Sequence, residues 1–299
     1  MAHTNSRHRS GKKFSVFQTV DVILMFFLML ITLYPMYYVV VASFSDPVLL
    51  KSHVGPLLRI LGKPTLAGYR KTLNNKSLLN GFRVTLFYLV VGTTLQVVLT
   101  SMGAFVVTRK SFLIRRGMMK FMVFTMFFSG GLIPQFFAIR NTGIYNTIWV
   151  SSIPYAVSAF NLIIMKSFFE SIPDSLEEAA IMDGANDFTV FARITLPLSK
   201  PVIAVMVLYY GVGQWNSWFP AAMFTRDRAI YPLQLILREI LIENKSVAAD
   251  NLAQAVEDTF TSELVQYCTI VVSTVPILVI YPFLQKYFEK GVMIGAVKE

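Results

Sequence analysis

Glu178-Ala179-Ala180-Ile181-Met182-Asp183-Gly184, followed after nine residues by Ile194-Thr195-Leu196-Pro197, is a short charged stretch between two long apolar runs. Its charged side chains make it too polar to cross a bilayer, where ionised groups are costly. We therefore expect the stretch to lie beside a membrane and to contact a further component there.

The apolar runs around this stretch dominate the composition of the chain. Of its 299 residues, 55% are hydrophobic and 15% are charged, whereas soluble domains carry about 25% charged residues. Six segments of 19 to 25 residues contain no Asp, Glu, Lys or Arg: 22–45, 84–108, 121–139, 141–165, 201–225 and 264–285. Because about 20 helical residues cross the hydrocarbon core, we predict an all-α, polytopic membrane protein with six transmembrane helices.

Six spans divide the chain into three parts. We expect a tail over 1–21, a transmembrane domain of six helices over 22–285, and a second tail over 286–299. The charged stretch belongs to a loop over 170–200, between the fourth and fifth spans. The first uncharged segment is longer than the apolar region of a signal peptide, so we expect it to remain as a span.

The formal net charge of +10 is concentrated in clusters beside the predicted spans. One cluster precedes the first span and another fills the link between the second and third: Arg7, Arg9, Lys12 and Lys13, then Arg109, Lys110, Arg115, Arg116 and Lys120. Such clusters are typical of cytoplasmic loops, which are attracted to anionic lipid. They place both termini in the cytoplasm, and they differ from the basic face of a folded nucleic-acid-binding protein.

The segment 46–83 opposes this orientation, because it should then be external although it carries seven Lys or Arg residues. The segment 226–263 should also be external, and its net charge is −3. We expect one or two short helices on the outer membrane surface in the first segment and a helix over 233–242 in the second. The second segment is either a solvated cap or a docking surface for a partner.

Local signals predict a helix-turn-helix within the charged loop. Ser175 and Glu178 have the spacing of a capping box at the start of the first helix, and Gly184 ends that helix, as glycine does where the backbone turns left-handed. Asn186 caps the second helix and Pro197 stops it. A DNA-binding role is disfavoured, because residues 166–200 include three basic and six acidic side chains.

The same residues resemble the EAA loop of binding-protein-dependent ABC importer permeases: Glu-Ala-Ala, three residues, Gly, nine residues and Ile-x-Leu-Pro, matched here without a gap. The order of six spans, the stretch Trp215-Asn216-Ser217-Trp218 and the ending over 290–298 resemble the carbohydrate-type permeases of this superfamily. The resemblance implies a type I permease architecture and a function in oligosaccharide import at the bacterial cytoplasmic membrane.

The resemblance also implies a set of partners: a second, homologous permease subunit, two ATP-binding cassette ATPase subunits and an extracellular solute-binding protein. The loop would insert into a groove on an ATPase subunit and couple ATP hydrolysis to the spans. The residues that match the motif there are Glu178, Ala179, Ala180, Asp183, Gly184, Ile194, Leu196 and Pro197. The alternative is a loop that only connects helices at the membrane surface.

The chain itself has no G-x-x-x-x-G-K-[ST] phosphate loop, so we expect ATP and Mg²⁺ to bind to the partner subunits. Its three histidines lie in a tail and a loop and form no pattern typical of a metal site or a catalytic triad. We therefore expect a non-catalytic subunit without a cofactor or metal of its own.

Amide and aromatic side chains within the predicted spans are the candidates for the substrate pathway: Gln96, Asn161, Gln214, Trp215 and Asn216. Uncharged groups of this kind fit an oligosaccharide, because aromatic rings stack on the apolar faces of sugars. The alternative is that the amides join helices and the tryptophan lies at a membrane interface. A permease for a non-sugar solute is a further alternative, as is a self-contained secondary carrier, although no charged residue interrupts the spans.

Overall fold

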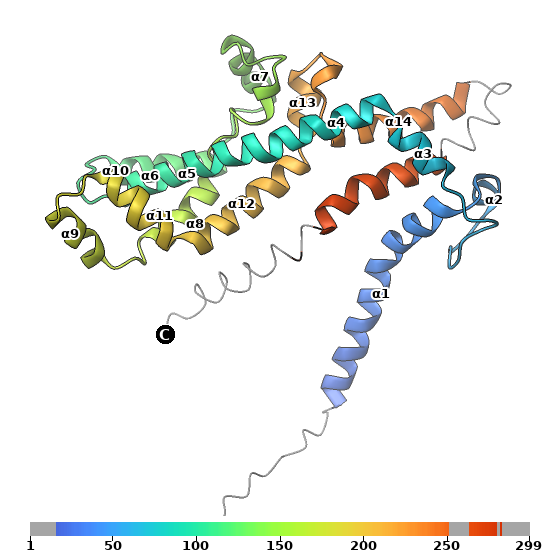
Figure 1. Ribbon diagram of the computed structural model, residues 1–299, viewed down its shortest axis with the longest axis horizontal. Coiled ribbons are helices and arrows are strands. Elements are labelled where there is room, and N and C mark those ends of the chain that lie inside the picture. Colours follow the sequence, from blue (N-terminus) through green and yellow to red (C-terminus); the bar gives the residue numbers. More distant parts are fainter. Residues whose placement is uncertain (1–15, 251–262, 280–281, 283–299) are drawn as a thin grey trace, which may run out of the picture.

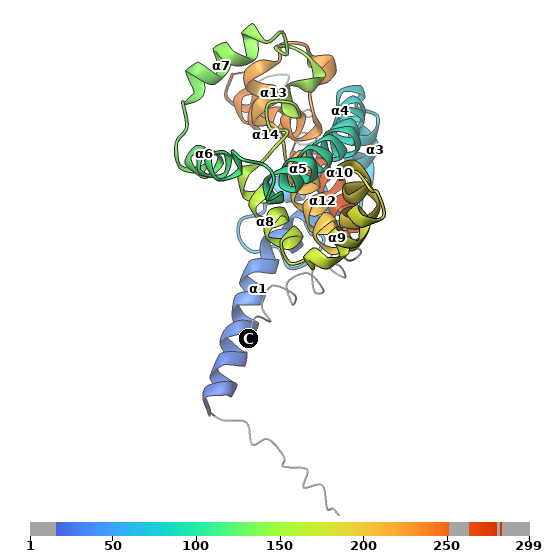
Figure 2. The ribbon, with the colours of Figure 1, turned by 90° about the vertical axis from the view of Figure 1, so that its left-hand side faces the viewer.

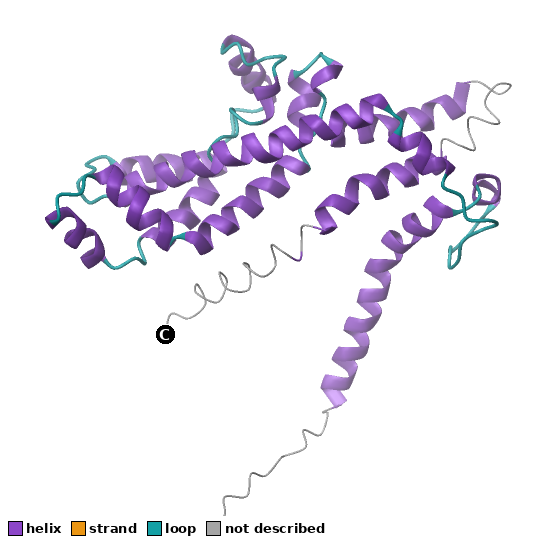
Figure 3. Cartoon of the chain, in the orientation of Figure 1, coloured by secondary structure: helices purple, strands orange, loops and turns teal. Residues whose placement is uncertain are grey.

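The computed structural model describes residues 16–250, 263–279 and 282, and these residues form helices and loops without a strand (Figure 3). The labelled helices in chain order are α1 (Val16–Phe44), α2 (Pro47–Ser52), α3 (Ala67–Leu73), α4 (Lys76–Phe87), η1 (Tyr88–Gly92), α5 (Thr93–Thr108), α6 (Arg115–Phe127), α7 (Leu132–Asn141), η2 (Ile148–Ser151), α8 (Ala159–Phe169), α9 (Asp174–Met182), α10 (Asp187–Val190), η3 (Phe191–Thr195), α11 (Leu196–Leu198), α12 (Lys200–Trp215), α13 (Phe219–Phe224), η4 (Arg228–Ile230) and α14 (Leu233–Asp250). A further helix covers Glu263–Val279. The elements η1 and η3 are π-helical turns, and η2 and η4 are 3-10 turns.

α4, η1 and α5 form one helix over Lys76–Thr108, which runs along the length of the molecule (Figure 1). α8 and α12 pack against α5, and the largest apolar core of the described residues lies between these helices. Leu162, Met165 and Met206 are fully buried in that core. Close packing of such side chains holds helices together in lipid as well as in water.

α1 extends away from the other helices (Figures 1 and 2). None of the residues in its most apolar window is buried, whereas 44% of the corresponding window of Lys76–Thr108 is buried. Near its end, Val41 and Ala42 pack against Leu50 and Leu57. α1 begins inside the predicted N-terminal tail, and it presents most of its apolar surface outward.

Two of the described helices are long and apolar enough to cross a membrane, over Phe17–Phe44 and Lys76–Thr108. They contain the second predicted span and all of the first except Ser45. A third candidate is a pair of helices, Asp187–Leu198 and Lys200–Trp215, that meet at an angle of 82°. The all-helical fold is confirmed, and the count of six spans stays a prediction.

The third and fourth predicted spans are not single helices, and that part of the prediction was wrong. The run 121–139 is broken at Gly131, whose φ of +87° favours glycine, so α6 and α7 are separate helices. The run 141–165 consists mostly of turns before α8, with positive φ at Gly143 and Asn146. Hydrophobic content therefore does not produce a continuous helix where residues that favour a left-handed backbone occur.

The fifth predicted span, 201–225, is also divided. α12 ends at Trp215, and α13 follows after a short break with Pro220 in its first turn. The sixth, 264–285, is helical as far as Val279, and the predicted tail over 286–299 lies outside the described residues. These breaks leave α12 and α8 shorter than a full span while both still pack on α5.

The two predicted surface segments both contain helices. α3 is a short helix within 46–83, and α14 begins at Leu233, the first residue of the helix predicted over 233–242. Figure 1 shows α2 and α3 at the end of the molecule opposite α9. The charged loop and the basic segment therefore lie at opposite ends of the long helix.

Candidate functional site

α9 is the first helix of the charged loop, and it starts one residue before Ser175. Pro173 occupies the N-cap position, and no side chain caps the helix. Ser175 is therefore the second helical residue, and the predicted capping box between Ser175 and Glu178 was wrong. Asp174 and Glu177 lie in the first turn, where negative charge interacts favourably with the helix dipole.

α9 ends at the glycine that the sequence predicts. Gly184 has a φ of +86°, and its N–H donates to the carbonyl oxygen of Ile181 at 2.9 Å. The N–H of Ala185 donates to the carbonyl oxygen of Ala180 at 2.9 Å. The two bonds form a Schellman motif, which closes the helix and turns the chain. A Cβ at Gly184 would meet no atom within 4 Å, so the backbone conformation alone favours glycine there.

The second helix of the loop begins as predicted and ends later. The side-chain oxygen of Asn186 accepts hydrogen bonds from the N–H of Thr189 at 2.8 Å and from its hydroxyl at 2.9 Å. The helix then runs through α10, η3 and α11 to Leu198, so the prediction that Pro197 stops it was wrong. The π-helical turn of η3 ends at Thr195, two residues before Pro197, and it accommodates a residue that has no N–H to donate.

The surface of this loop combines apolar and acidic side chains. No residue of α9 is buried, and Figure 1 shows this helix at one end of the molecule. Met182 is 87% exposed, and Ile181 and Phe188 are also exposed. The eight predicted coupling residues divide into exposed and half-buried groups: Glu178, Ala179, Asp183, Gly184 and Pro197 are exposed, and Ala180, Ile194 and Leu196 are half-buried. Exposed apolar side chains beside charges are typical of a protein-binding surface.

Two ion pairs join α9 to the residues that follow α5, and the sequence patterns do not reveal them. Arg109 pairs with Glu177, and the Nζ atom of Lys110 lies 2.5 Å from a carboxylate oxygen of Asp174. The Arg109 guanidinium also lies 3.7 Å from the centre of the Phe105 ring. The basic cluster of the predicted cytoplasmic link is thus partly committed to contacts within the chain.

The Lys110–Asp174 pair shifts the pKa of both its members, and burial shifts the pKa of Arg109. The hydrogen bond to Lys110 lowers the pKa of the Asp174 carboxyl, and the same bond raises the pKa of the Lys110 ammonium. Burial lowers the pKa of the Arg109 guanidinium, against the opposing effect of nearby Asp187 and Asp174. All three groups remain charged at neutral pH, because their ordinary pKa values lie far from 7.

A cavity of about 340 Å³ lies between α5, α8 and α12, and we call it the polar cavity after the amide and hydroxyl side chains among its lining residues. Its lining residues are amides, hydroxyls and aromatic rings: Gln96, Ser151, Tyr155, Ser158, Asn161, Tyr209, Tyr210, Gly213, Gln214, Ser217 and Pro220. Three of the five predicted pathway residues, Gln96, Asn161 and Gln214, therefore meet at one site. No charged side chain is among the described residues that line it.

The two glutamines of the cavity are only partly hydrogen-bonded. The amide nitrogen of Gln96 donates to the carbonyl oxygen of Tyr155 at 3.0 Å, and that of Gln214 donates to the carbonyl oxygen of Ser151 at 3.4 Å. The side chains are 4% and 3% exposed, and neither Oε1 atom has a hydrogen-bond partner. Buried polar atoms are normally paired, so these two acceptors are candidates for a hydroxyl-bearing ligand.

Gly92 brings Gln214 close to the long helix. A Cβ at this position would lie 2.7 Å from the hydroxyl oxygen of Ser152 and 3.0 Å from the amide nitrogen of Gln214. These distances are shorter than ordinary contacts, so any larger residue at position 92 would push the amide aside. The glycine permits the close approach of α12 that the cavity requires.

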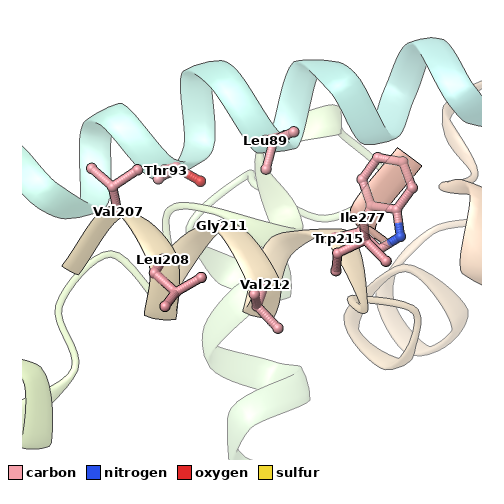
Figure 4. Close-up of a pocket in the computed structure, with 8 residues that line it drawn as sticks. All are labelled: Leu89, Thr93, Val207, Leu208, Gly211, Val212, Trp215 and Ile277. Carbon is pink, nitrogen blue, oxygen red and sulfur yellow. The ribbon is translucent and has the colours of Figure 1, made fainter. Parts of the chain in front are cut away.

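The other two predicted pathway residues lie elsewhere. Trp215 is 4% exposed and packs edge-on against Phe82, with ring centres 6.5 Å apart. It borders an apolar pocket of about 210 Å³ between α12 and the long helix, beside Ile277 (Figure 4). Asn216 is exposed at the C-terminal end of α12. Neither residue lines the polar cavity, and their contact with substrate stays a prediction.

Helical geometry explains this separation. The cavity takes four residues from α12 and one that follows it, and they recur after three or four positions: Tyr209, Tyr210, Gly213, Gln214 and then Ser217. The apolar pocket takes the residues between them: Val207, Leu208, Gly211, Val212 and Trp215. Because consecutive residues point about 100° apart around a helix, two neighbours such as Gln214 and Trp215 face different sides of α12.

No cluster of three His, Cys, Asp or Glu residues that could hold a metal ion occurs in the part of the chain that the structure describes. The charged loop and the polar cavity are the two candidate sites.

Comparisons with known proteins agree with this geometry. No protein-family model matches the chain. The chain is 37% identical over 271 residues to the polygalacturonan/rhamnogalacturonan transport system permease protein YtcP of Bacillus subtilis (strain 168), covering 90% of this chain and 93% of that protein. It is 36% identical over 299 residues to protein LplC of the same organism, covering 99% and 98%. A crystal structure of a bacterial ABC transporter involved in the import of the acidic polysaccharide alginate matches with a TM-score of 0.83 and 30% identity, over 95% of this chain and 100% of that chain.

Proposed function

This chain belongs to the permease subunits of carbohydrate ABC importers, and we propose that it carries an oligosaccharide across the bacterial cytoplasmic membrane when partner subunits hydrolyse ATP. Family membership makes the chain a membrane-embedded, non-catalytic transport subunit. The proposal adds the size class of the substrate, the route and the means of coupling.

The polar cavity is the observation that supports an oligosaccharide. The amide oxygens of Gln96 and Gln214 are covered and unpaired, so a rotation of either side chain toward the cavity would let it accept from a sugar hydroxyl, and the rings of Tyr155 and Tyr209 offer flat faces for the C–H groups of a sugar. A cavity of about 340 Å³ is large enough for a small ligand or for one unit of a longer chain. YtcP is named as part of a polygalacturonan/rhamnogalacturonan transport system, and the similar solved structure is of a transporter involved in alginate import, which favours the same substrate class.

α9 supports the proposed coupling. Its exposed apolar and acidic residues form a rigid surface that fits a groove on an ATPase subunit, and Glu178 and Asp183 are placed to pair with basic groups there. In this proposal two ATP-binding cassette ATPases hold ATP and Mg²⁺, and a second permease subunit completes the pathway. An extracellular solute-binding protein delivers the substrate on the opposite face of the membrane.

Reconstitution tests the transport function. The chain would be placed in proteoliposomes with its partner permease and both ATPases, and uptake of labelled oligogalacturonides would be measured with the binding protein present. We expect uptake that requires ATP and survives collapse of proton and sodium gradients. Uptake driven by an ion gradient without the ATPases would support a secondary carrier, and uptake of amino acids or peptides in place of sugars would refute the substrate class.

Membrane orientation is tested by single cysteines. In this proposal both termini and 170–200 are cytoplasmic, and 46–83 and 226–263 are external. Ser175 and Ser77 are both exposed, so each would be replaced by cysteine in a Cys268→Ala background. An impermeant thiol reagent added to intact cells should label position 77 and spare position 175. The reverse pattern would invert the topology.

A further inference from the structure

The end of α5 and the start of α9 are far apart in the sequence, and side-chain contacts hold them together. α5 ends at Thr108, and the two residues after it, Arg109 and Lys110, pair with Glu177 and Asp174 of α9. The two pairs involve acidic residues one turn apart on the same helix. Two adjacent contacts of this kind fix the direction of α9 as well as its distance from α5.

Arg109 is the inner member of this junction. Its side chain is 12% exposed, and its guanidinium lies over the Phe105 ring of α5 at 3.7 Å. That ring in turn lies 5.0 Å from the ring of Phe191 in η3. A guanidinium that pairs with a carboxylate and stacks on an aromatic ring is held in one orientation. Arg109 thus connects α5, α9 and the second helix of the loop.

Lys110 is the outer member. Its side chain and that of Asp174 are mostly exposed, with the charged atoms 2.5 Å apart. The groove between Lys110 and α9 is lined by further acidic residues, including Glu178 and Asp187. The positive charge of Arg115 repels that of Lys110. The electrostatic field therefore draws the two basic residues toward the loop.

Two routes lead from α9 to the polar cavity. The covalent route passes through α10, η3 and α11 and then turns by 82° at Ser199 before it reaches Gln214 on α12. The other route crosses the ion pairs and follows α5 directly from Arg109 to Gln96. Thr108 lies twelve helical positions after Gln96, a rigid length of about 18 Å.

We propose that Arg109 and Lys110 form a clamp through which α9 moves α5, so that a displacement imposed on α9 reaches the cavity wall at Gln96. The inference rests on the proposed coupling function and deepens it. It assigns a positioning role to two residues outside the EAA motif. Within this clamp α9 and α5 move as one body, while the bend at Ser199 absorbs the change in angle to α12.

Charge exchange tests the clamp. Each charge would be reversed singly, and both charges of a pair would be reversed together: Lys110→Asp with Asp174→Lys, and Arg109→Glu with Glu177→Arg. Transport per ATP hydrolysed would then be measured in proteoliposomes with the binding protein. We expect each single variant at the Arg109 pair to lower the transport-to-ATP ratio about tenfold, and each at the Lys110 pair by less, with most of the loss restored in the double variants. Single variants with the normal ratio, or double variants no better than the singles, would overturn the clamp.

An ion pair within one helix provides the matched control. Lys166 of α8 pairs at 2.6 Å with Glu170, the residue at the C-cap of the same helix, so exchanging their charges alters the same chemistry without joining two helices. The exchange of that pair should leave the transport-to-ATP ratio unchanged. Reversing the charge of the half-buried Arg109 could prevent assembly of the transporter. In that case the exposed Lys110–Asp174 pair still tests the clamp, because substitutions of surface charges seldom affect folding.

A covalent link distinguishes a clamp from a sliding contact. Cysteines at positions 110 and 174, in the Cys268→Ala background, would be joined by a short bifunctional thiol reagent. If α9 and α5 move together, the cross-linked transporter should retain uptake, whereas a block of uptake would overturn the proposal. Gly184→Val separates the two hypotheses: if it uncouples transport and the charge reversals do not, the clamp fails while the coupling function stands.

Discussion

The charged loop and the polar cavity are built in opposite ways. The loop takes its shape from residues a few positions apart, namely a positive-φ glycine at 184 and a capping asparagine at 186, and it stays exposed. The cavity joins side chains such as Gln96 and Gln214, which are 118 residues apart, inside the helix bundle. The loop should therefore be disrupted most by a substitution that changes the backbone conformation. The cavity should be disrupted most by a substitution of a lining side chain or of the core that supports it.

The largest effect should come from the core beside the cavity. Trp215→Ala removes a large buried ring that packs on Phe82, and the cavity left behind should destabilise the protein by about 3–5 kcal/mol. Thermal unfolding in detergent and ATPase activity would be measured together with uptake, and all three should fall in parallel. The half-buried Trp218, replaced in the same way, should cost less stability. Loss of uptake in Trp215→Ala with normal stability and ATPase activity would instead support substrate contact.

The second effect tests the loop by itself. Gly184→Val places a β-branched residue at a φ of +86°, which costs on the order of 1–3 kcal/mol and misdirects α10. We expect uptake to fall about tenfold or more while the protein still reaches the membrane. Gly143→Val is the matched control, because Gly143 also has positive φ and open space around it but lies outside the loop. Equal loss of uptake in both variants would mean that strain alone, and not the loop, is responsible.

The sequence predicts the loop better than the cavity because the signals of the loop are local. Gly184 and Asn186 determine their turns whatever surrounds them, and both act as expected. The observed ends of the two loop helices differ from the predicted ends by only a few residues. The first helix has its N-cap at Pro173 and the second continues past Pro197, because neighbouring turns shift to accommodate proline. The ion pairs of Arg109 with Glu177 and of Lys110 with Asp174 escape prediction, since the number of residues between two charges does not indicate whether helices bring them together.

Composition is a weaker guide to the spans and to the pathway. Gly131 and Asn146 have positive φ and interrupt apolar runs that are long enough to cross a membrane. The hydrophobicity of a run does not reveal such a change in backbone direction. The prediction grouped Gln214 with Trp215 because they are neighbours in sequence. The spacing of Tyr210, Gln214 and Ser217 is the signal that separates them, since intervals of four and three residues place polar side chains on one side of α12 and of the residues that follow it.

A smaller effect is expected from one amide of the cavity. Gln214→Leu keeps the approximate volume and removes the hydrogen-bonding groups, so the KM for oligosaccharide uptake should rise up to about tenfold, the equivalent of one hydrogen bond. ATPase stimulation by the binding protein should persist. Gln234→Leu, on the half-buried side of α14 and outside the cavity lining, serves as the control. An unchanged KM in Gln214→Leu would remove this residue from the substrate route.

The smallest effect concerns the outer ion pair and its dependence on pH. Because Lys110 lowers the pKa of the Asp174 carboxyl, the pair stabilises the folded protein above the ordinary carboxyl pKa of about 4, and the stabilisation disappears as the pH falls through the lowered value. The pKa of Lys110 is raised, so the stabilisation is also lost on the alkaline side, as the pH rises through that raised value.

Between these limits the contribution should be constant, and any change of transport between about pH 5 and 9 must have another origin. Asp174→Asn should lower the melting temperature at neutral pH by less than about 2 °C, because exposed pairs contribute little and salt screens them. The difference from the unmodified protein should vanish in strong acid and in high salt. A difference that persists in acid cannot come from an ionised carboxylate, and it would mean that Asp174 acts on α9 through its shape or its hydrogen bonding and that the outer half of the clamp is not electrostatic.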